Sequence, residues 1–501
     1  MIKNILLIIA VISSLNSFSQ DFQWANSQPY ASYVTWDSHV TTDNLGNTFI
    51  SSQHQNGVLI VKYDHSGEQV WKKNYLGYGN ITSLCTDNDG NLYATIMISG
   101  LTINGTLYAA SGGEPNGYLF MKVDMQGNEL WIKQINPAIL LADKTDAQNN
   151  ITVSGGFGYT TVFENGNTLT ASSDFRKNFF MGKFNTNGEC LWLIQEDGGR
   201  FAPLKEKDGF IYACDYFYGH ITLGKGSKQV TLYESNGMGY IAKYDSVGEL
   251  QWVKQVITCG IAVNSDGSLL SFEPNGSFPN AYLKKYDSNG NLLWTRTHIL
   301  IGNWYKFAMQ SGKNNDLYFT GGYSGFMTID DTTISDSHAR TFVAKVDSSG
   351  AFKWLISTAG SGSAGGKDLS VFNGNEIYIT GDMSNSNSFG SYTTSQTNGG
   401  IYVAKISDLD ITPVKEIPSF ASSFDVFPNP SGSVFNVSYK GCSSEATINI
   451  KNQLGQIVYS KKYSNQSELK DSFNLSSQPK GIYFIELISD KSREVRKMVL
   501  Q

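Results

Sequence analysis

The chain has 501 residues, of which 40% are apolar, 13% aromatic and only 16% charged. This amount of apolar material can build folded cores and excludes a chain that is disordered throughout. The net charge of -6 gives no general attraction to nucleic acid or anionic lipid, so we expect no nucleic-acid partner. The combination of 50 Gly with many aromatic residues favours β-structure with frequent turns.

The N-terminus has the three-part layout of a secretory signal peptide. Lys3 precedes an apolar run over 5–12, which is followed by small polar residues up to Ser19. The run is too short to span a bilayer, and no later stretch is long enough either, so we expect no transmembrane span. We predict a signal peptide over residues 1–19 with cleavage between Ser19 and Gln20. The alternative is a buried N-terminal strand or helix.

A strand–turn–strand pattern with Trp in its second strand recurs through most of the chain. Its tight Asp-x-x-Gly turn lets Asp bond to the backbone and lets Gly adopt a positive φ. The complete copies are VKYDHSGEQVW (61–71), MKVDMQGNELW (121–131), GKFNTNGECLW (182–192), AKYDSVGELQW (242–252), KKYDSNGNLLW (284–294) and AKVDSSGAFKW (344–354). A second hairpin precedes each copy, for example TTDNLGNTFIS (41–51). Each unit therefore predicts four antiparallel strands.

The repeat is incomplete at both ends, and the two incomplete parts complement each other. The segment YVAKISDLD (402–410) lacks a Trp strand, whereas DFQWANS (21–27) is a Trp strand with nothing before it. Together they make a seventh copy. We therefore predict an all-β fold in which residues 20–410 form a seven-bladed β-propeller with four-stranded blades, the last blade being closed by the N-terminal strand. The alternative is an open solenoid, which would not need a copy shared between the termini.

The pattern seen in KKYDSNGNLLW (284–294) resembles the seven-bladed propeller repeat of many bacterial secreted proteins, over nearly all of residues 21–409. It is less similar to the Trp-docking repeat of quinoprotein dehydrogenases. The propellers of those enzymes usually have eight blades, bind pyrroloquinoline quinone and carry a vicinal Cys pair, whereas this chain has no adjacent cysteines. We expect no cofactor.

After the repeats, the pattern changes. A stretch with Pro and Ser predicts a linker over residues 411–423. Residues 424–501 contain short alternating segments around PNP, LGQ and PKG turns, which predict a small C-terminal β-sandwich.

These last residues closely resemble the type A C-terminal sorting domain of the type IX secretion system of certain Gram-negative bacteria. The motif residues that carry the resemblance are Pro428, Asn429, Pro430, Gly455, Gly481, Tyr483 and Lys497. The resemblance implies Sec-dependent export, recognition of the tail by the type IX translocon, and a secreted or outer-membrane surface location. The alternative is a carbohydrate-binding or adhesive β-sandwich.

The sequence contains no local motif for catalysis or metal binding. The six His residues are scattered, and there is no HExxH, no GxSxG and no phosphate-cradling loop. The sequence Asp87-Asn88-Asp89-Gly90 is similar to part of a calcium loop but lacks the remaining ligands, so we interpret it as a turn. We predict no catalytic residue and no metal site.

Long connections indicate where a ligand would bind. In a four-stranded antiparallel blade the short hairpin turns lie on one face, and the longer, variable connections lie on the other, which we call the loop-rich face. Rigid scaffolds place function in such loops. The candidate ligand-binding residues are Trp36, Tyr78, Arg200, Trp304 and Tyr305.

We therefore predict a secreted or cell-surface, non-enzymatic propeller that binds an extracellular glycan or protein through its loop-rich face. The alternative is a propeller hydrolase or lyase acting on extracellular polysaccharide. That alternative requires carboxylates together with His or Arg in the central channel.

Overall fold

The chain divides into two compact units, Met1–Leu409 and Asp410–Gln501, which are described separately. The computed structural model describes residues 20–29, 38–54, 57–109, 117–135, 138–157, 160–163, 166–170, 179–196, 204–257, 260–274, 281–296, 301–408, 424–440, 445–452, 455–464, 468–489 and 493–501. The predicted signal peptide (1–19) and linker (411–423) lie outside these residues. Apart from two single-turn 3₁₀ segments, the described elements are strands, so the all-β prediction is confirmed. Among the described residues, no helix has the length and apolar character needed to cross a membrane.

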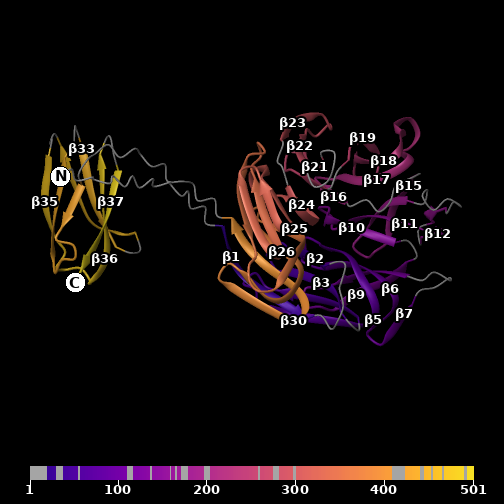
Figure 1. The fold of residues 1–501 in the computed structure, drawn as a ribbon, viewed down its shortest axis with the longest axis horizontal. Coiled ribbons are helices and arrows are strands. Elements are labelled where there is room, and N and C mark those ends of the chain that lie inside the picture. The colour runs from indigo at the N-terminus through magenta and orange to yellow at the C-terminus, as the bar shows by residue number, and fades with distance from the viewer. Residues whose placement is uncertain are drawn as a thin grey trace, which may run out of the picture. The chain divides into compact units, whose positions relative to one another are not determined.

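Antiparallel groups of four strands follow one another along the first unit (Figure 1). The first group contains β2 (Ser38–Thr42), β3 (Thr48–His54), β4 (Gly57–Tyr63) and the start of the long strand β5 (Gln69–Thr86). The second group contains the end of β5, β6 (Leu92–Ile103), β8 (Gly117–Val123) and β9 (Glu129–Ile135). Next come β10 (Ala138–Thr145), β11 (Ile151–Gly156), β14 (Phe179–Phe184) and β15 (Cys190–Glu196), then β16 (Leu204–Lys207), β17 (Phe210–Leu223), β18 (Val230–Tyr244) and β19 (Leu250–Gln255). The later groups are β20 (Gly260–Val263), β21 (Leu269–Pro274), β22 (Ala281–Tyr286) and β23 (Leu292–Arg296), then β24 (Ile301–Ser311), β25 (Leu317–Ile329), β26 (Thr332–Val346) and β27 (Phe352–Ser357).

The last group of the first unit is completed by the N-terminal strand. It contains β28 (Ser363–Phe372), β29 (Glu376–Phe389), β30 (Tyr392–Asp408) and β1 (Gln20–Pro29). β1 is antiparallel to β30, with Gln20 opposite Asp408 and Pro29 opposite Gly400. This is the pairing that the split repeat predicts, and it gives β30 a partner on both sides, with β1 as the outer strand of the sheet.

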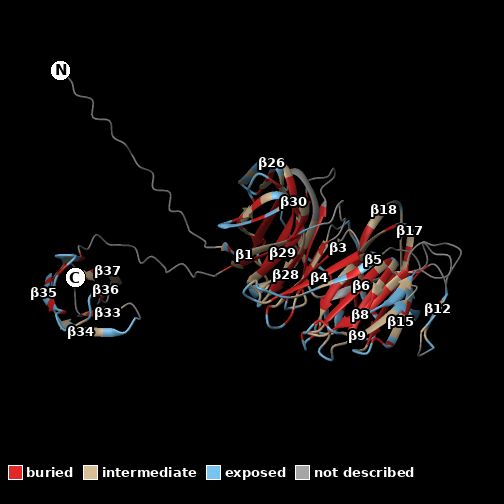
Figure 2. Ribbon diagram, turned by 90° about the horizontal axis from the view of Figure 1, so that it is seen from below, coloured by how far each residue is buried: buried red, intermediate tan, exposed pale blue. Residues whose placement is uncertain are grey.

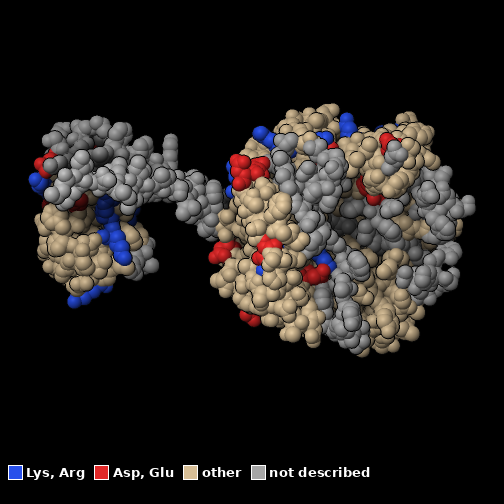
Figure 3. All heavy atoms as spheres, in the orientation of Figure 1, with Lys and Arg blue, Asp and Glu red and all other residues tan. Residues whose placement is uncertain are grey.

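The first strands of the groups form a closed ring around a central axis. Each contacts the first strand of the next group, in the cyclic order β2, β5, β10, β16, β20, β24, β28 and back to β2. Burial is concentrated within these sheets, where the strands are buried and the turns are exposed (Figure 2). In space-filling representation the middle of this unit is hollow (Figure 3).

Five of the repeated Trp residues make the same contact between neighbouring groups, whereas the indole N–H of Trp354 donates to the Asp408 carboxylate at 3.1 Å. The indole N–H of Trp24 donates to the carbonyl of His65 at 3.3 Å, and that of Trp71 donates to Met125 at 3.0 Å. Both acceptors follow the Asp that opens an Asp-x-x-Gly turn, and Trp131, Trp192 and Trp252 bond the equivalent carbonyls of Thr186, Ser246 and Ser288. The turn Gly67 has a φ of +91°, and a Cβ there would lie 2.7 Å from the Trp24 ring. Gly is therefore needed both for the turn and for the approach of the indole.

A buried lysine on the third strand of most groups adds a polar link. Six such side chains are buried: Lys62, Lys122, Lys183, Lys243, Lys345 and Lys405. The Lys122 ammonium lies 2.9 Å from the Asp87 carboxylate of its own group and also donates to the Thr186 hydroxyl of the next group. Buried charges require such partners, so these lysines fix the first hairpin of one group against the second hairpin of its neighbour.

The second unit has two antiparallel sheets that share one core. One sheet contains β31 (Phe424–Phe427), β32 (Val434–Lys440) and β35 (Glu468–Asn474). The other contains β34 (Ile457–Ser464), β33 (Glu445–Lys451), β36 (Gly481–Ser489) and β37 (Arg493–Leu500). Phe435 of the first sheet and Ile448, Ile485 and Met498 of the second are fully buried in the same cluster.

Candidate functional site

The first strands of the groups line a cavity of about 510 Å³ in the first unit. Its described walls come from β2, β5, β10, β16, β24 and β28. They run from the middle of these strands to the short turns that follow, such as Asp43–Asn44 and Asp87–Asn88. The described part of this cavity therefore lies toward the short-turn side of the ring, opposite the loop-rich face.

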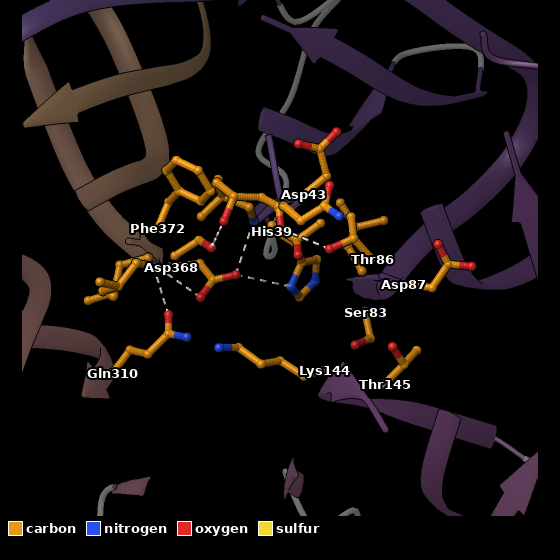
Figure 4. Close-up of a pocket in the computed structure, with 18 of the residues that line it drawn as sticks. His39, Asp43, Ser83, Thr86, Asp87, Lys144, Thr145, Gln310, Asp368 and Phe372 are labelled. Atoms are coloured by element: carbon orange, nitrogen blue, oxygen red, sulfur yellow. Dashed lines mark hydrogen bonds and ion pairs between the residues drawn. The ribbon is translucent and has the colours of Figure 1, made fainter. Parts of the chain in front are cut away.

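His39 and Asp368 face each other in this cavity, from the first and last groups of the ring (Figure 4). The His39 Nδ1 lies 3.9 Å from the Asp368 Oδ2, and about a quarter to a third of each side chain is exposed. The backbone N–H of Val40 donates to Asp368 Oδ2 at 3.1 Å, and that of Leu369 donates to Oδ1 at 2.8 Å. Burial raises the pKa of Asp368, although His39, these N–H groups and Lys205 act in the opposite direction. The carboxylate thus links β2 to β28 and still reaches the cavity.

Lys144 gives the cavity a cationic group. Its side chain extends from β10 into the space occupied by Asp368 and by the amide of Gln310 (Figure 4). Within the described parts of the chain it has no ion-pair partner, in contrast to the Asp43 and Asp87 carboxylates in the same wall, which are paired with buried lysines at 3.8 and 2.9 Å. Lys205 of the neighbouring strand β16 adds a second ammonium to the lining.

Hydroxyl and amide groups complete the lining. The Thr42 and Ser370 hydroxyls are 2.8 Å apart, and the Gln310 Oε1 accepts the N–H of Val371 at 2.9 Å. Ser83 and Thr145 lie on the opposite wall (Figure 4). The cavity can therefore offer ammonium, carboxylate, amide and hydroxyl groups to a polar ligand.

The five residues predicted for the loop-rich face have different outcomes. Tyr78 is 74% exposed, at the point where β5 passes from one group to the next. Trp36 and Arg200 lie outside the described residues. Trp304 and Tyr305 are part of β24, opposite Tyr323 and Gly322, but the positions of their own side chains lie outside the description. Their role in ligand binding stays a prediction.

Tyr78 is part of an exposed apolar strip. Leu76 is 57% exposed and lies opposite Thr102 of β6. On the other side of β6, Thr102 lies opposite Leu107 of β7 (Thr106–Ala109). Residues directly opposite in a sheet point to the same side, and Leu107 is 67% exposed. We call Leu76, Tyr78 and Leu107 the β5–β7 strip. Other exposed aromatic residues on long second-to-third-strand hairpins are Tyr218, Tyr233, Phe326 and Tyr392.

In the second unit, several of the predicted motif residues contact the last strand. The Asn429 Nδ2 donates to the Lys497 carbonyl at 2.6 Å, and its Oδ1 accepts the Val499 N–H at 2.9 Å. Pro428 and Pro430 flank Asn429, and both are preceded by cis peptide bonds. Tyr483 lies opposite Met498 on the neighbouring strand and donates its hydroxyl to the Pro479 carbonyl at 2.6 Å.

The glycines of the motif occupy positions that favour Gly. Gly455 has a φ of +77° and closes a turn in which its N–H donates to the Asn452 carbonyl at 3.0 Å. Gly481 has a φ of +153° and lies opposite Leu500. Asn429, Gly481 and Tyr483 thus lie next to β37, whereas Gly455 lies in the turn between β33 and β34.

Residues 425–501 match the family described as a secretion system C-terminal sorting domain. The resemblance seen in the motif residues is therefore confirmed, and the second unit is the sorting domain of a secretion system. A comparison with curated proteins finds no match for the chain.

Several solved structures are similar to this chain. Hydrazine synthase of Kuenenia stuttgartiensis has 13% identity and a TM-score of 0.42, over 70% of this chain and 94% of its own. The β-propeller domain of the Trilobed protease from Pyrococcus furiosus has 10% identity and a TM-score of 0.39, over 75% and 96%. PorZ, a surface component of the type IX secretion system of Porphyromonas gingivalis, has 11% identity and a TM-score of 0.20, over 92% of both chains. These likenesses are too distant to transfer a function.

The cavity residues carry no local motif, and sequence reasoning did not single out His39, Lys144, Lys205 or Asp368. A signal was nevertheless present in the first hairpins. His39 precedes Asp43 by the same interval as Ser83 precedes Asp87, so aligning these hairpins would have placed both side chains in one layer of the ring.

Proposed function

We propose that this protein is a seven-bladed β-propeller, closed by its N-terminal strand and followed by a C-terminal β-sandwich, that binds an extracellular glycan or protein through its loop-rich face. The cyclic contacts of the first strands and the β1–β30 pairing support the propeller. The two sheets with a common core support the sandwich. The binding role is non-enzymatic in this proposal.

The sorting domain supports a secreted or cell-surface location. In this proposal the signal peptide directs Sec-dependent export, and the type IX translocon then recognises the folded sorting domain. Truncation after Ser423 should retain the protein in the periplasm. Normal secretion of the truncated chain would refute this route.

The β5–β7 strip is the observation that carries the binding role. Leu76, Tyr78 and Leu107 expose more than half of their surfaces on adjoining strands. Rigid aromatic and aliphatic side chains at the centre of an interface supply most of its binding energy. Because these residues lie on sheet extensions, they are presented without the entropy cost of ordering a loop.

A glycan and protein array probed with the secreted chain would test this role. The Tyr78→Ala variant should weaken binding of the captured ligand by roughly 1–3 kcal/mol, and Leu107→Ser should weaken it too. Leu293→Ala is the matched control, because Leu293 is also exposed but lies near a short turn of β23. The absence of any captured ligand, or equal binding by all variants, would overturn the proposal.

A hydrolase or lyase acting on polysaccharide is the second candidate. The observation that favours it is the approach of His39, Asp368 and Lys144 in the channel, since acid–base chemistry needs such groups together. Release of reducing sugars or unsaturated uronates from a polysaccharide panel, abolished by Asp368→Asn, would support the enzyme. A folded protein without such activity would leave the binding role.

A further inference from the structure

The charges of the central cavity are arranged differently from those elsewhere in the ring. On the third strands, buried lysines such as Lys122 and Lys345 lie within 2.9 Å of an acidic partner. Lys144 instead projects from a first strand into the cavity, and no ion pair joins it to another described residue. An ammonium group held at a cavity wall in this way is available to an anion.

The opposite wall carries a hydrogen-bond acceptor. Asp368 receives two backbone N–H groups and keeps about 30% of its side chain exposed to the cavity. A carboxylate can accept further hydrogen bonds, which alcohol groups can donate. The same carboxylate repels a ligand that carries anionic charge on every side, so it disfavours inorganic phosphate or sulfate.

The remaining lining suits a ligand with several hydroxyl groups. Ser83 and Thr145 present hydroxyls and Gln310 presents an amide (Figure 4). Thr42 and Ser370, whose hydroxyls bond each other, also line the cavity. The cavity of about 510 Å³ falls within the range of small-molecule sites and has room for one or two sugar rings.

We infer that the central cavity binds a carboxylate-bearing sugar, such as the uronate unit of an acidic glycan. The uronate carboxylate pairs with Lys144, while ring hydroxyls donate to Asp368 and exchange hydrogen bonds with the Thr, Ser and Gln side chains. Lys205 on the neighbouring strand β16 also lines the cavity. This site is separate from the β5–β7 strip and does not depend on the ligand that the loop-rich face binds.

Calorimetric titration of the full secreted chain with D-glucuronate, D-glucose and succinate tests this inference. Glucuronate supplies both the carboxylate and the hydroxyls, so it should bind at least about tenfold more tightly than either of the other two. Equal affinity for succinate would overturn the sugar assignment, and equal affinity for glucose would overturn the role of the carboxylate. A lack of glucuronate binding would overturn the site altogether.

Two lysine variants locate the site. Lys144→Met should lower the glucuronate affinity by about tenfold or more, because it removes the cation that faces the carboxylate. Lys144 is exposed in the cavity, so this variant should melt at the same temperature as the parent. Lys228→Met, which changes a surface lysine of the β17–β18 hairpin, should leave the affinity unchanged. If Lys144→Met binds glucuronate as tightly as the parent, the cavity is not the binding site. The separate proposal of binding at the β5–β7 strip is tested by Tyr78→Ala and is not affected by this result.

Discussion

The side-chain amide of Asn429 bonds both the carbonyl of Lys497, at 2.6 Å, and the N–H of Val499, at 2.9 Å. Both bonds join the PNP segment to the last strand of the sorting domain. A backbone bond of 3.0 Å from the Ser431 N–H to the Val499 carbonyl reinforces the same junction. The PNP sequence and the C-terminal residues therefore form one structural feature, which a translocon would encounter as a single surface.

Asn429→Ala should impair secretion. The change removes two solvent-exposed hydrogen bonds to β37, each of which should contribute about 0.5–1.5 kcal/mol to the unfolding free energy of the domain. In a host with the secretion system, the secreted fraction should fall several-fold while cell-associated protein accumulates. Asn436→Ala is the control, since Asn436 lies on β32 and bonds a side-chain hydroxyl of its own sheet. Equal secretion of the two variants would contradict this prediction.

Trp24→Ala should destabilise the first unit. Trp24 is 8% exposed, packs against Tyr63 and Tyr378, and donates to the carbonyl of His65. Truncating a buried Trp costs roughly 3–5 kcal/mol, and here the loss falls on the strand that joins the two ends of the ring. Denaturant unfolding of Gln23→Ala, an exposed neighbour on the same strand, provides the comparison. Similar unfolding midpoints for both variants would argue against β1 as the closing strand.

The Trp contacts could be predicted because every partner belongs to the repeat. One copy of the turn and one Trp strand suffice to propose the packing, and the structure repeats it from Trp24 to Trp252. The tail motif was equally accessible, since its residues occur in order at the end of the chain.

The cavity could not be predicted in the same way. His39 and Asp368 come from opposite ends of the first unit and meet only because the ring closes. The chemistry of such a pair depends on which inner-strand positions share a layer, and this follows from strand register across the ring, which becomes visible only when the first hairpins are aligned with one another. For the same reason, the predicted loop-face residues were chosen by context alone, and of these five only the Tyr78 side chain is described, as an exposed one.

Lys122→Met should reveal the importance of the buried lysines. Lys122 is 4% exposed and neutralises Asp87, whose side chain is fully buried. Removing the cation leaves a buried carboxylate without its counter-charge, which should lower the free energy of unfolding by roughly 3–5 kcal/mol. Lys228→Met removes a solvent-exposed pair with Glu249 and should have a much smaller effect. The double variant Lys122→Met/Asp87→Leu should be more stable than Lys122→Met, because it no longer buries an unpaired carboxylate. If the losses of unfolding free energy in the two single variants simply add up in the double variant, the ion pair is not the cause of the loss in Lys122→Met.

Glu196 should make the first unit less stable as the pH rises through neutrality. The carboxyl is buried at the end of β15 and accepts the Tyr244 hydroxyl at 2.7 Å. Burial raises its pKa from 4.5 to about 7, so the folded state holds the proton more tightly than the unfolded chain does. The contribution of this proton to stability is therefore complete at pH values below the unfolded pKa and is lost as the pH rises from there through about 7.

Glu196→Gln tests this assignment because the amide stays neutral while its oxygen can still accept the Tyr244 hydroxyl. The variant should be more stable than the parent at about pH 8, by roughly 1–3 kcal/mol, and the difference should shrink toward about pH 5. Chemical denaturation across this pH range measures both chains. Glu249→Gln, which neutralises an exposed carboxylate, should not reproduce the effect. A Glu196→Gln chain with the same pH dependence as the parent would show that Glu196 is not the group that titrates near neutral pH.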